Sequence, residues 1–198
     1  MSATRLLVLG GVRIYGRAHG YRLGVDLLSW GVEQWANVKW GSIYHALRKL
    51  ASEGLLTATQ FEKWPGRVDY EITARGEAEF FRLLRDALKQ PNHHPEMLAA
   101  GVAMLPALTR DEAVALLRAR LATLEQERGE IVSALDQPGP SDLPSHIAEL
   151  YCLWMSFASS QVEWTRGLIE RLENGAYVMA GEDGHPFGTS GTPHVEHP

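Results

Sequence analysis

The chain has 198 residues, of which 45% are hydrophobic and 22% are charged, a composition ordinary for a folded protein of one domain or two small ones. No apolar run approaches the roughly 20 residues of a membrane helix, and we expect no signal peptide because no small-residue cleavage site follows the apolar start. The single cysteine, Cys152, excludes an internal disulfide and favours a reducing cytoplasm. Its apolar helical surroundings predict a packing residue rather than a nucleophile.

Charge is divided unevenly along the chain. Residues 1–90 contain 13 Lys and Arg against 9 Asp and Glu, a net charge of +4, whereas residues 91–198 contain 6 against 15, a net charge of −9. The formal net charge of the whole chain is therefore −5, which by itself argues weakly against nucleic acid. A basic half joined to an acidic half indicates that only the first half meets phosphate.

Apolar spacing and glycines predict three helices in the first 54 residues. In chain order the segments are a helix over 4–12, a polar turn over 13–21, a helix over 21–30, a linker over 35–40 and a helix over 41–53. We expect Leu23, Leu27 and Trp30 (or Leu28) on the buried side of the second helix, which Gly31 ends.

The third helix combines one apolar face with a polar circumference. Ile43, Leu47 and Leu50 fall at i, i+4 and i+7. We expect Ser42 as its N-cap, and Gly54 as the glycine that stops it. The remaining positions carry hydroxyl, imidazole and cationic groups, on Ser42, Tyr44, His45, Arg48 and Lys49. Such a helix suits insertion into a DNA major groove, although taken alone it would pass for an ordinary surface helix.

A β-hairpin and a fourth helix follow. Residues 55–64 and 67–73 read as strands around the turn signal Pro65-Gly66, and the second strand places Val68, Tyr70 and Ile72 on one face. The hairpin tip carries Lys63, Trp64 and Arg67, and a helix is expected from Thr73 to about Lys89. Three helices followed by a basic-tipped hairpin is the element order of a winged helix-turn-helix.

The second half of the chain reads as helices after a break at residues 91–95. We expect a short helix over 96–105, a long one over 111–135 with Thr109 as N-cap, a loop at 138–140 and a last helix over 144–173. The second of these has a heptad pattern, with Arg128 in register, which predicts packing along another helix. The pattern is formed by Val114, Leu117, Leu121, Leu124, Ile131 and Leu135. From residue 175 the composition predicts a disordered tail.

Because the hairpin follows the third helix, we favour Arg48 and Lys49 as DNA contacts over solvated surface charges. Tyr44 has a second interpretation, packing on the second helix with its hydroxyl toward a phosphate. Trp64 either packs or is exposed, and we favour packing. The two cations of the hairpin tip suit phosphate or minor-groove contacts better than base reading. The full predicted DNA-contacting set is Tyr21, Lys39, Ser42, Tyr44, His45, Arg48, Lys49, Lys63 and Arg67.

An aromatic stripe on the last helix predicts a dimer core, with an aromatic-lined pocket for a flat small molecule as the alternative. The predicted dimer or ligand interface is Leu117, Leu121, Leu124, Trp154, Phe157 and Trp164.

Catalytic and metal signatures are weak. His93 and His94 lack carboxylate or cysteine partners at ligand spacing, and His185, His194 and His197 lie in the expected tail. No Gly-rich phosphate loop or Ser-His-Asp arrangement stands out. We therefore expect no enzyme, no cofactor and no metal.

Several segments of the chain together resemble the PadR family of transcriptional regulators. The matching segments are Leu9-Gly10, His19-Gly20-Tyr21, Gly41-Ser42-Ile43-Tyr44 with Ala46 to Leu50, Glu53-Gly54-Leu55, and Arg67 to Gly76. The later part resembles the virulence-activator-like C-terminal domain of one PadR subgroup, through its helix lengths and Glu163-Trp164. The chain departs from the family at His45, where a proline is usual. A histidine there adds a donor or acceptor and could alter base preference or its dependence on pH.

The resemblance implies a homodimer that binds a palindromic operator on double-stranded DNA, usually as a repressor, in some members with a small ligand. We therefore expect a mainly α fold with a small β-hairpin. Its parts are a winged helix-turn-helix over 1–90, a helical dimerisation and effector domain over 95–175, and the tail over 176–198. The predicted function is cytoplasmic, sequence-specific transcriptional regulation by a repressor that an aromatic ligand releases. The alternative is a winged-helix adaptor that binds protein without sequence-specific DNA binding.

Overall fold

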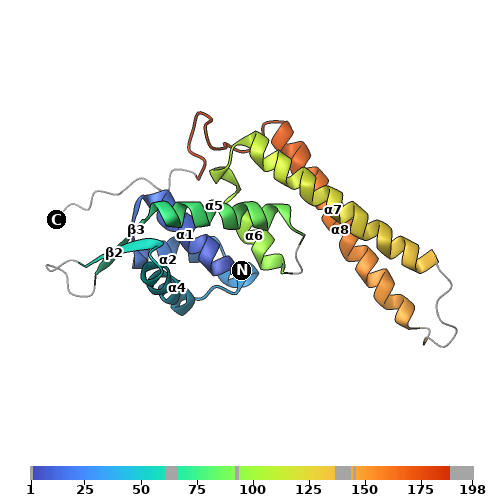
Figure 1. Ribbon diagram of the computed structural model, residues 1–198, viewed down its shortest axis with the longest axis horizontal. Helices are drawn as coiled ribbons and strands as arrows, with labels where there is room; N and C mark the ends of the chain where they lie inside the picture. The colour runs from blue at the N-terminus through green and yellow to red at the C-terminus, as the bar shows by residue number, and fades with distance from the viewer. Residues whose placement is uncertain (1, 61–66, 92–93, 137–143, 145, 188–198) are drawn as a thin grey trace. The chain divides into compact units, whose positions relative to one another are not determined.

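The structure is a computed structural model that describes residues 2–60, 67–91, 94–136, 144 and 146–187 (Figure 1). It divides into two compact units. The first is built from described residues within 1–87, 92–107 and 178–198, and the second from those within 88–91 and 108–177. The fold is mainly helical with one small antiparallel sheet, as expected from the sequence.

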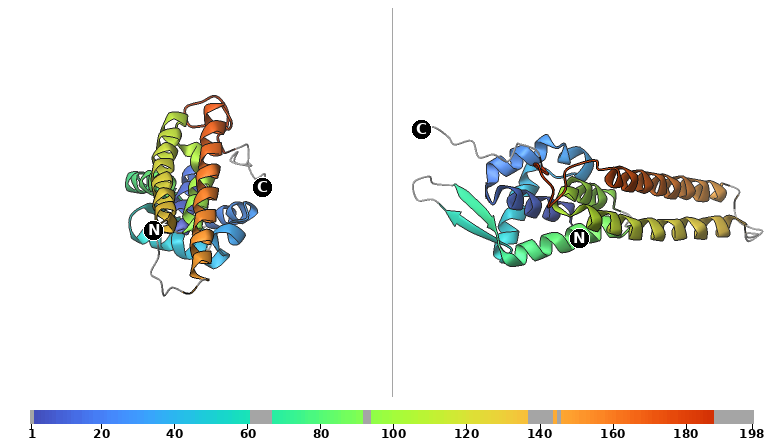
Figure 2. Two further views of the ribbon diagram at one scale, coloured as in Figure 1. Left: turned by 90° about the vertical axis from the view of Figure 1, so that its right-hand side faces the viewer. Right: turned by 90° about the horizontal axis from the view of Figure 1, so that it is seen from above.

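The first unit contains most of the elements. They are α1 (Ala3–Tyr15), β1 (Arg17–His19), α2 (Gly20–Ser29), α3 (Val32–Ala36), α4 (Trp40–Ser52), β2 (Leu56–Gln60), β3 (Val68–Ile72), most of α5 (Ala74–Lys89), α6 (Pro95–Ala103) and a 3₁₀ turn over Leu105–Ala107. The two strands of the hairpin, β2 and β3, lie side by side in the right-hand view of Figure 2. Its connection, with the predicted Pro65-Gly66 turn, lies outside the described residues.

The sheet has three strands in the order β1-β3-β2, all antiparallel. Tyr70 is the centre of its register, opposite Ala18 on one side and Ala58 on the other. The polar turn expected over 13–21 was therefore wrong, because Arg17–His19 forms β1. A three-residue strand is too short to show alternation, and its pairing with β3 is a tertiary contact that the sequence pattern does not report.

Helix α1 supplies the centre of the core. Leu6, Leu7 and Leu9 are fully buried, and the small Gly10 allows close packing against α5 and α6. A Cβ at Gly10 would lie 2.4 Å from Met104 Sδ and 2.9 Å from Phe80 Cε2. Interiors packed at crystal-like density do not absorb such overlaps without displacement, so Gly10 fixes how closely these helices approach.

Helix α4 buries the predicted stripe of Ile43, Leu47 and Leu50. It ends as predicted, with Gly54 at φ 72°. The amide of Gly54 donates to Ala51 O and that of Leu55 to Leu50 O, the two bonds of a Schellman motif. The predicted N-cap was wrong. The helix begins at Trp40 after Lys39, and the Ser42 amide already donates to Lys39 O at 2.9 Å.

Two predictions between residues 20 and 40 were also wrong. Leu23 and Leu27 are buried as expected, but Trp30 follows the end of α2 and is 38% exposed, whereas the alternative, Leu28, is half-buried. The segment after it contains the short helix α3, whose Trp35 Nε1 donates to Trp30 O at 2.9 Å. This bond and the buried Val32 hold a turn that apolar periodicity does not reveal over five residues.

The second unit is a pair of long helices, α7 (Arg110–Asp136) and α8 (Ile147–Glu173), that run side by side in Figures 1 and 2. The heptad prediction for α7 is confirmed in its first half, where Val114, Leu117 and Leu124 are buried. The predicted cap is confirmed too, because Thr109 Oγ1 accepts from the Glu112 amide at 3.3 Å. The predicted loop at 138–140 lies outside the described residues.

The stretch after α8 differs from the expected tail in its described part, residues 176–187. The Arg110 guanidinium donates to the carbonyls of Ala176 and Tyr177, at 3.0 and 2.9 Å. Met179 is fully buried, and its amide donates to Glu182 at 3.0 Å. These contacts use backbone groups, which composition does not report.

Candidate nucleic-acid interface

The outer face of α4 is an exposed, uncompensated basic surface. Lys39, Arg48 and Lys49 are exposed, and within the described ranges none of them makes an ion pair. Other arginines of this unit are matched: Arg13 lies 2.7 Å from Glu77, and Arg82 lies 2.7 Å from Glu79. Ser42 and His45 are exposed beside the basic residues. This face therefore offers hydrogen-bond donors and positive charge together, which is the chemistry that DNA contact requires.

Arg48 lies next to two tyrosines. The phenol of Tyr70, from the central strand, is buried, and burial raises its pKa above the ordinary value, with the Arg48 charge opposing and Tyr44 adding to the shift. The three side chains therefore share one patch where α4 crosses the sheet. Tyr44 is half-buried, which agrees with its second interpretation, packing with only part of the ring exposed.

Gly20 brings α2 against this patch. A Cβ there would lie 3.2 Å from Tyr44 Cε1, 3.3 Å from Leu47 Cδ1 and 3.7 Å from Tyr70 Cε2. A larger side chain would push the first turn of α2 away from α4, so this position sets the spacing of the two helices.

Tyr21 follows Gly20 and is 60% exposed. Its amide donates to Nδ1 of His19, which caps α2, at 3.0 Å. Its ring meets Trp40 edge-on with centroids 5.4 Å apart, and Trp40 lies 5.8 Å from Tyr44. An aromatic series thus joins the N-terminal turns of α2 and α4 and aligns Tyr21 with the exposed face of α4.

Trp40 and His19 were missed as site-building residues by the sequence reasoning. A Cβ at Gly24 would lie 2.8 Å from Trp40 Cζ3, so the indole packs directly on the backbone of α2. The spacing of Gly20 and Gly24, one helical turn apart, was the signal that could have indicated a close helix contact there.

The hairpin contributes less than expected to the described interface. Arg67 lies at the start of β3, with its Nε 3.2 Å from the carboxylate of Asp69, which is 5% exposed. Its charge is therefore partly matched within the fold. Lys63 and Trp64 lie outside the described residues, so the role of the tip stays a prediction.

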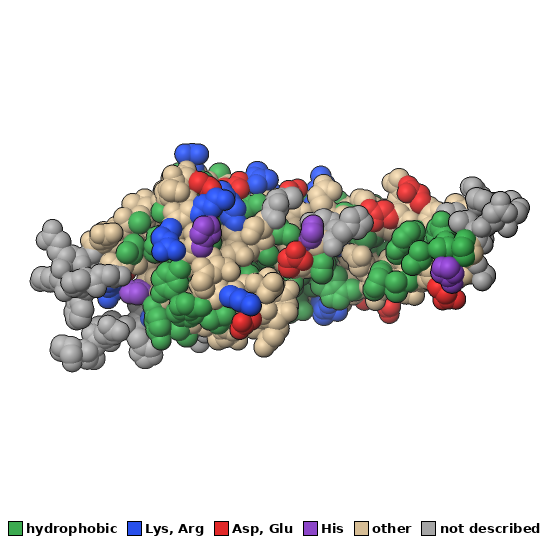
Figure 3. All heavy atoms as spheres, turned by 90° about the horizontal axis from the view of Figure 1, so that it is seen from below, with side chains coloured by type: hydrophobic (Ala, Val, Ile, Leu, Met, Phe, Trp, Pro, Cys, Tyr) green, Lys and Arg blue, Asp and Glu red, His purple; other side chains and the backbone are tan. Residues whose placement is uncertain are grey.

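The predicted interface residues of the second unit fall into two groups. Leu117 and Leu124 are buried within the chain and Leu121 is half-buried, all on α7. On α8, in contrast, Phe157 is 59%, Trp154 49% and Trp164 38% exposed. Hydrophobic side chains gather on the surface of this helix pair that Figure 3 presents. Leu117 and Leu124 of α7 thus pack within the pair of helices, while the aromatic residues of α8 remain accessible.

Cys152 is exposed on α8, so its prediction as a packing residue was wrong. The helical pattern around it was read correctly, but the side chain lies outside the contact with α7. Among the described residues no group of three or more His, Cys, Asp and Glu is arranged to hold a metal ion. None of the helices described is long and apolar enough to span a membrane.

The three-helix core, the exposed basic helix and the hairpin after it define a winged helix-turn-helix domain. Residues 8–82 match the model of the transcriptional regulator PadR-like family. Over these residues the chain is similar to that family, which is one of transcriptional regulators rather than of enzymes. The family resemblance of the sequence is thereby confirmed.

Solved structures give further matches. The chain is 19% identical to Bacillus subtilis PadR in a complex with operator DNA, covering 85% of this chain and 98% of that one, with a TM-score of 0.37. It is 17% identical to the same regulator in a complex with p-coumaric acid, covering 87% and 98%, with a TM-score of 0.36. The PadR-like regulator BC1756 from Bacillus cereus is 17% identical, covering 86% and 98%, with a TM-score of 0.36. No curated protein matches the sequence.

Proposed function

We propose that the chain is a sequence-specific DNA-binding repressor whose helix α4 enters the major groove. The observation that carries the proposal is the exposed face of α4, on which Arg48 and Lys49 have no anionic partner among the described residues. B-DNA has a major groove wide enough for one α-helix, and arginine is the commonest reader of guanine edges there. Arg48, which lies on α4 near Tyr44 of the same helix and Tyr70 of β3, is the proposed base reader.

The remaining contacts are assigned to the DNA backbone. Lys39 and Lys49 lie near the two ends of α4, and Tyr21 presents its hydroxyl from the start of α2. Lysines and tyrosines commonly bind phosphate oxygens and thereby fix the register of a protein on the duplex. Arg67 and Lys63 complete this set at the hairpin. Ser42 and His45 lie between the groups and are proposed to contact base edges.

The protein is proposed to act as a homodimer through the exposed face of α8. Leu150, Leu153, Trp154, Phe157 and Trp164 share one side of that helix and are each at least 38% exposed. A contiguous aromatic surface of this kind is typical of a protein interface. A twofold dimer presents two copies of α4, which explains why a palindromic operator is expected.

Repression would follow from occupancy of the operator, in the cytoplasmic compartment that the sequence favours. The proposed effector is a planar aromatic molecule that binds among the aromatic residues of α8; a p-coumaric acid complex is known for Bacillus subtilis PadR. A ligand that binds the folded state raises the melting temperature as its concentration rises. Thermal unfolding with a series of hydroxycinnamic acids therefore tests the effector separately from DNA binding.

The primary test is binding of the purified full chain to the DNA upstream of its own gene, at two salt concentrations, with random DNA as competitor. We expect binding that survives the competitor and weakens as salt is raised, because counterions are released from contacted phosphates. Binding that is absent at both salt concentrations, on this fragment and on a library of random sequences, would favour the winged-helix adaptor instead.

A further inference from the structure

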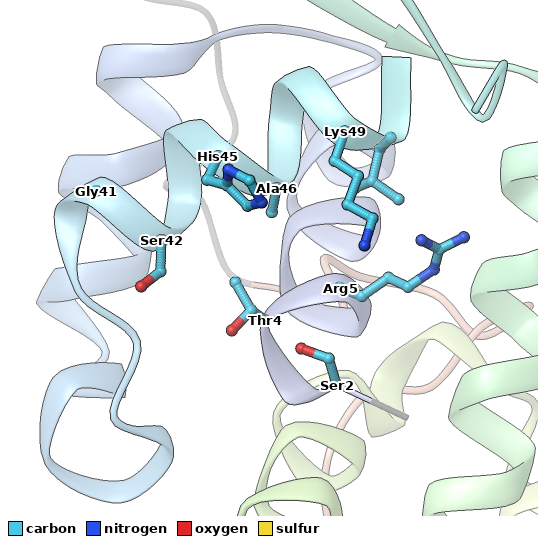
Figure 4. A pocket seen from close by; sticks show the side chains of 9 residues that line it. Ser2, Thr4, Arg5, Gly41, Ser42, His45, Ala46 and Lys49 are labelled. Atoms are coloured by element: carbon cyan, nitrogen blue, oxygen red, sulfur yellow. The ribbon is translucent and has the colours of Figure 1, made fainter. Parts of the chain in front are cut away.

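The first unit contains a crevice whose α1 side takes no part in the contacts proposed above. It lies between the N-terminus of α1 and the side of α4, and has a volume of about 440 Å³. Its polar lining comes from Ser2, Thr4 and Arg5 on α1 and from Ser42, His45 and Lys49 on α4. Figure 4 shows Lys49 extending from α4 toward Arg5 and the first turn of α1.

The charges around this crevice leave one cation unmatched. Arg5 is paired with Glu53 at 2.6 Å and with Glu79 at 3.4 Å, so its charge is balanced by the fold. Lys49 makes no ion pair with a described residue. The crevice therefore has a net attraction for an anion at its Lys49 side, while Arg5 is held in place as a fixed donor.

The opposite wall is the beginning of a 13-residue helix. Ser2 has the extended backbone of an N-cap residue, but its side chain makes no capping hydrogen bond. The first amides of a helix have no partner within the helix, and the helix dipole places partial positive charge there. The hydroxyls of Ser2 and Thr4 add neutral hydrogen-bond donors to the same wall.

The size of the crevice and its place beside α4 bear on what it can hold. A volume of about 440 Å³ exceeds what a single small anion fills and suits a group of nucleotide size. Ala46 and Leu50 provide an apolar surface for a sugar, next to the charged groups for a phosphate. Ser42, His45 and Lys49 line the crevice and also belong to the exposed DNA face of α4. A DNA strand at the edge of the major groove would therefore reach the crevice while α4 reads the bases.

We propose that the crevice between α1 and α4 binds a sugar-phosphate unit of the DNA backbone, with Ser2, Thr4 and Arg5 as additional DNA-contacting residues. The proposal rests on the proposed DNA binding and extends it to α1. It assigns α1 two roles, because the same helix forms the core through Leu6, Leu7 and Leu9.

The test adds charge at the α1 wall without disturbing the fold. Ser2→Asp keeps a favoured N-cap residue, and acidic groups stabilise a helix N-terminus. We expect roughly threefold to tenfold weaker DNA binding at low salt from one added negative charge beside a phosphate. Thr109→Asp is the matched control, because it adds the same charge at the N-cap of α7, in the other unit. We expect the control to bind as the wild type does.

A second variant reverses the sign. Thr4→Lys adds a cation to the wall, and we expect tighter binding and a salt dependence steeper by about 0.9 in slope, the value of one further phosphate contact. Structural damage does not tighten binding, so this result would support a direct contact. Equal affinity and equal slope for Ser2→Asp, Thr4→Lys and Thr109→Asp, while the wild type still binds DNA, would overturn the crevice assignment alone. If the wild type shows no salt-dependent DNA binding, the proposed function itself fails.

A DNA-free arm separates the backbone from a free phosphorylated molecule. Inorganic phosphate is titrated at constant ionic strength while the amide signals of Thr4 and Lys49 are followed by NMR. Saturable shifts in the wild type, together with unchanged DNA binding by Ser2→Asp, would assign the crevice to a free anion and overturn the DNA assignment. Weak or absent shifts with impaired DNA binding by Ser2→Asp would support it.

Discussion

The exposed face of α4 and the exposed face of α8 have opposite chemistry. On α4 the exposed charged groups are cationic, and the stripe of Ile43, Leu47 and Leu50 is turned into the core. On α8 the accessible groups include five large hydrophobic side chains, among them two tryptophans. Solvated cations are stable without a partner, whereas clustered exposed aromatic rings indicate a surface that another surface covers. The difference supports the proposal of an anionic partner for α4 and that of a second copy of the chain for α8.

The largest effect is expected from a charge on the aromatic face. Phe157→Glu would place a carboxylate at the centre of the proposed dimer contact, where burying an unpaired charge is strongly unfavourable. We expect the dimer dissociation constant to rise at least about a hundredfold, as measured by analytical ultracentrifugation. Cys152→Glu is the control, because Cys152 is exposed on the same helix but lies about 140° around it. A Phe157→Glu protein as dimeric as the control would remove this face from the interface.

A substitution in the contact between α2 and α4 is expected to come next. Gly24→Ala would place a methyl group within 3 Å of the Trp40 ring, which should lower the free energy of unfolding by about 1–3 kcal/mol. Gly41→Ala is the matched control within a helix, since a Cβ there meets nothing within 4 Å. We expect that variant to be unchanged or up to about 1 kcal/mol more stable. Chemical denaturation measures both, and similar values for the two would contradict the packing of Trp40 on α2.

The variant Arg48→Ala tests whether Arg48 contributes to the preference for operator DNA over random DNA. If Arg48 reads a base, its loss should reduce the preference for the operator over random DNA by about tenfold, while non-specific binding changes less. Competition binding with both DNAs at one salt concentration gives the ratio. Equal losses on operator and random DNA would make Arg48 a phosphate contact like Lys49.

The smallest expected effect is a change in the free energy of unfolding at alkaline pH. It depends on neither the exposed face of α4 nor that of α8. Burial raises the pKa of Tyr15 to about 12, with the hydrogen bond to Asp26 as the next cause. Because the pKa is raised in the folded state, its contribution to stability is complete below the ordinary value of 10.0 and is lost as the pH rises toward 12. The free energy of unfolding should therefore fall over this interval, and less steeply in Tyr15→Phe. Parallel profiles for the two proteins would contradict the assignment.

Sequence reasoning worked best where one element carries its own pattern. The apolar stripe of α4, the Gly54 stop and the heptads in the first half of α7 each follow from residues within one segment. It failed where the deciding contact is distant. Strand β1 exists because Ala18 pairs opposite Tyr70, some fifty residues later.

The residues of the candidate site also fall into those that were predictable from one segment and those that depend on contacts between helices. Arg48 and Lys49 were identified from the sequence because their positions on a helix with one apolar stripe leave them outside. The contributions of Ser2, Thr4 and Trp40 were not, because they depend on how α1 and α2 approach α4.

The sequence by itself determined the family resemblance of the first domain, the order of the longer helices and the apolar stripes of α4 and of the first half of α7, since these depend on local periodicity and on glycine and capping chemistry. Only the tertiary structure decided which surfaces remain exposed. Leu117 and Leu124 of α7 are buried within one chain, whereas the aromatic residues of α8 are left accessible. A sequence pattern marks a residue as apolar but does not identify the surface that covers it. The crevice beside α4 likewise arises from the packing of two helices, because a cavity is a property of the space between elements rather than of either one.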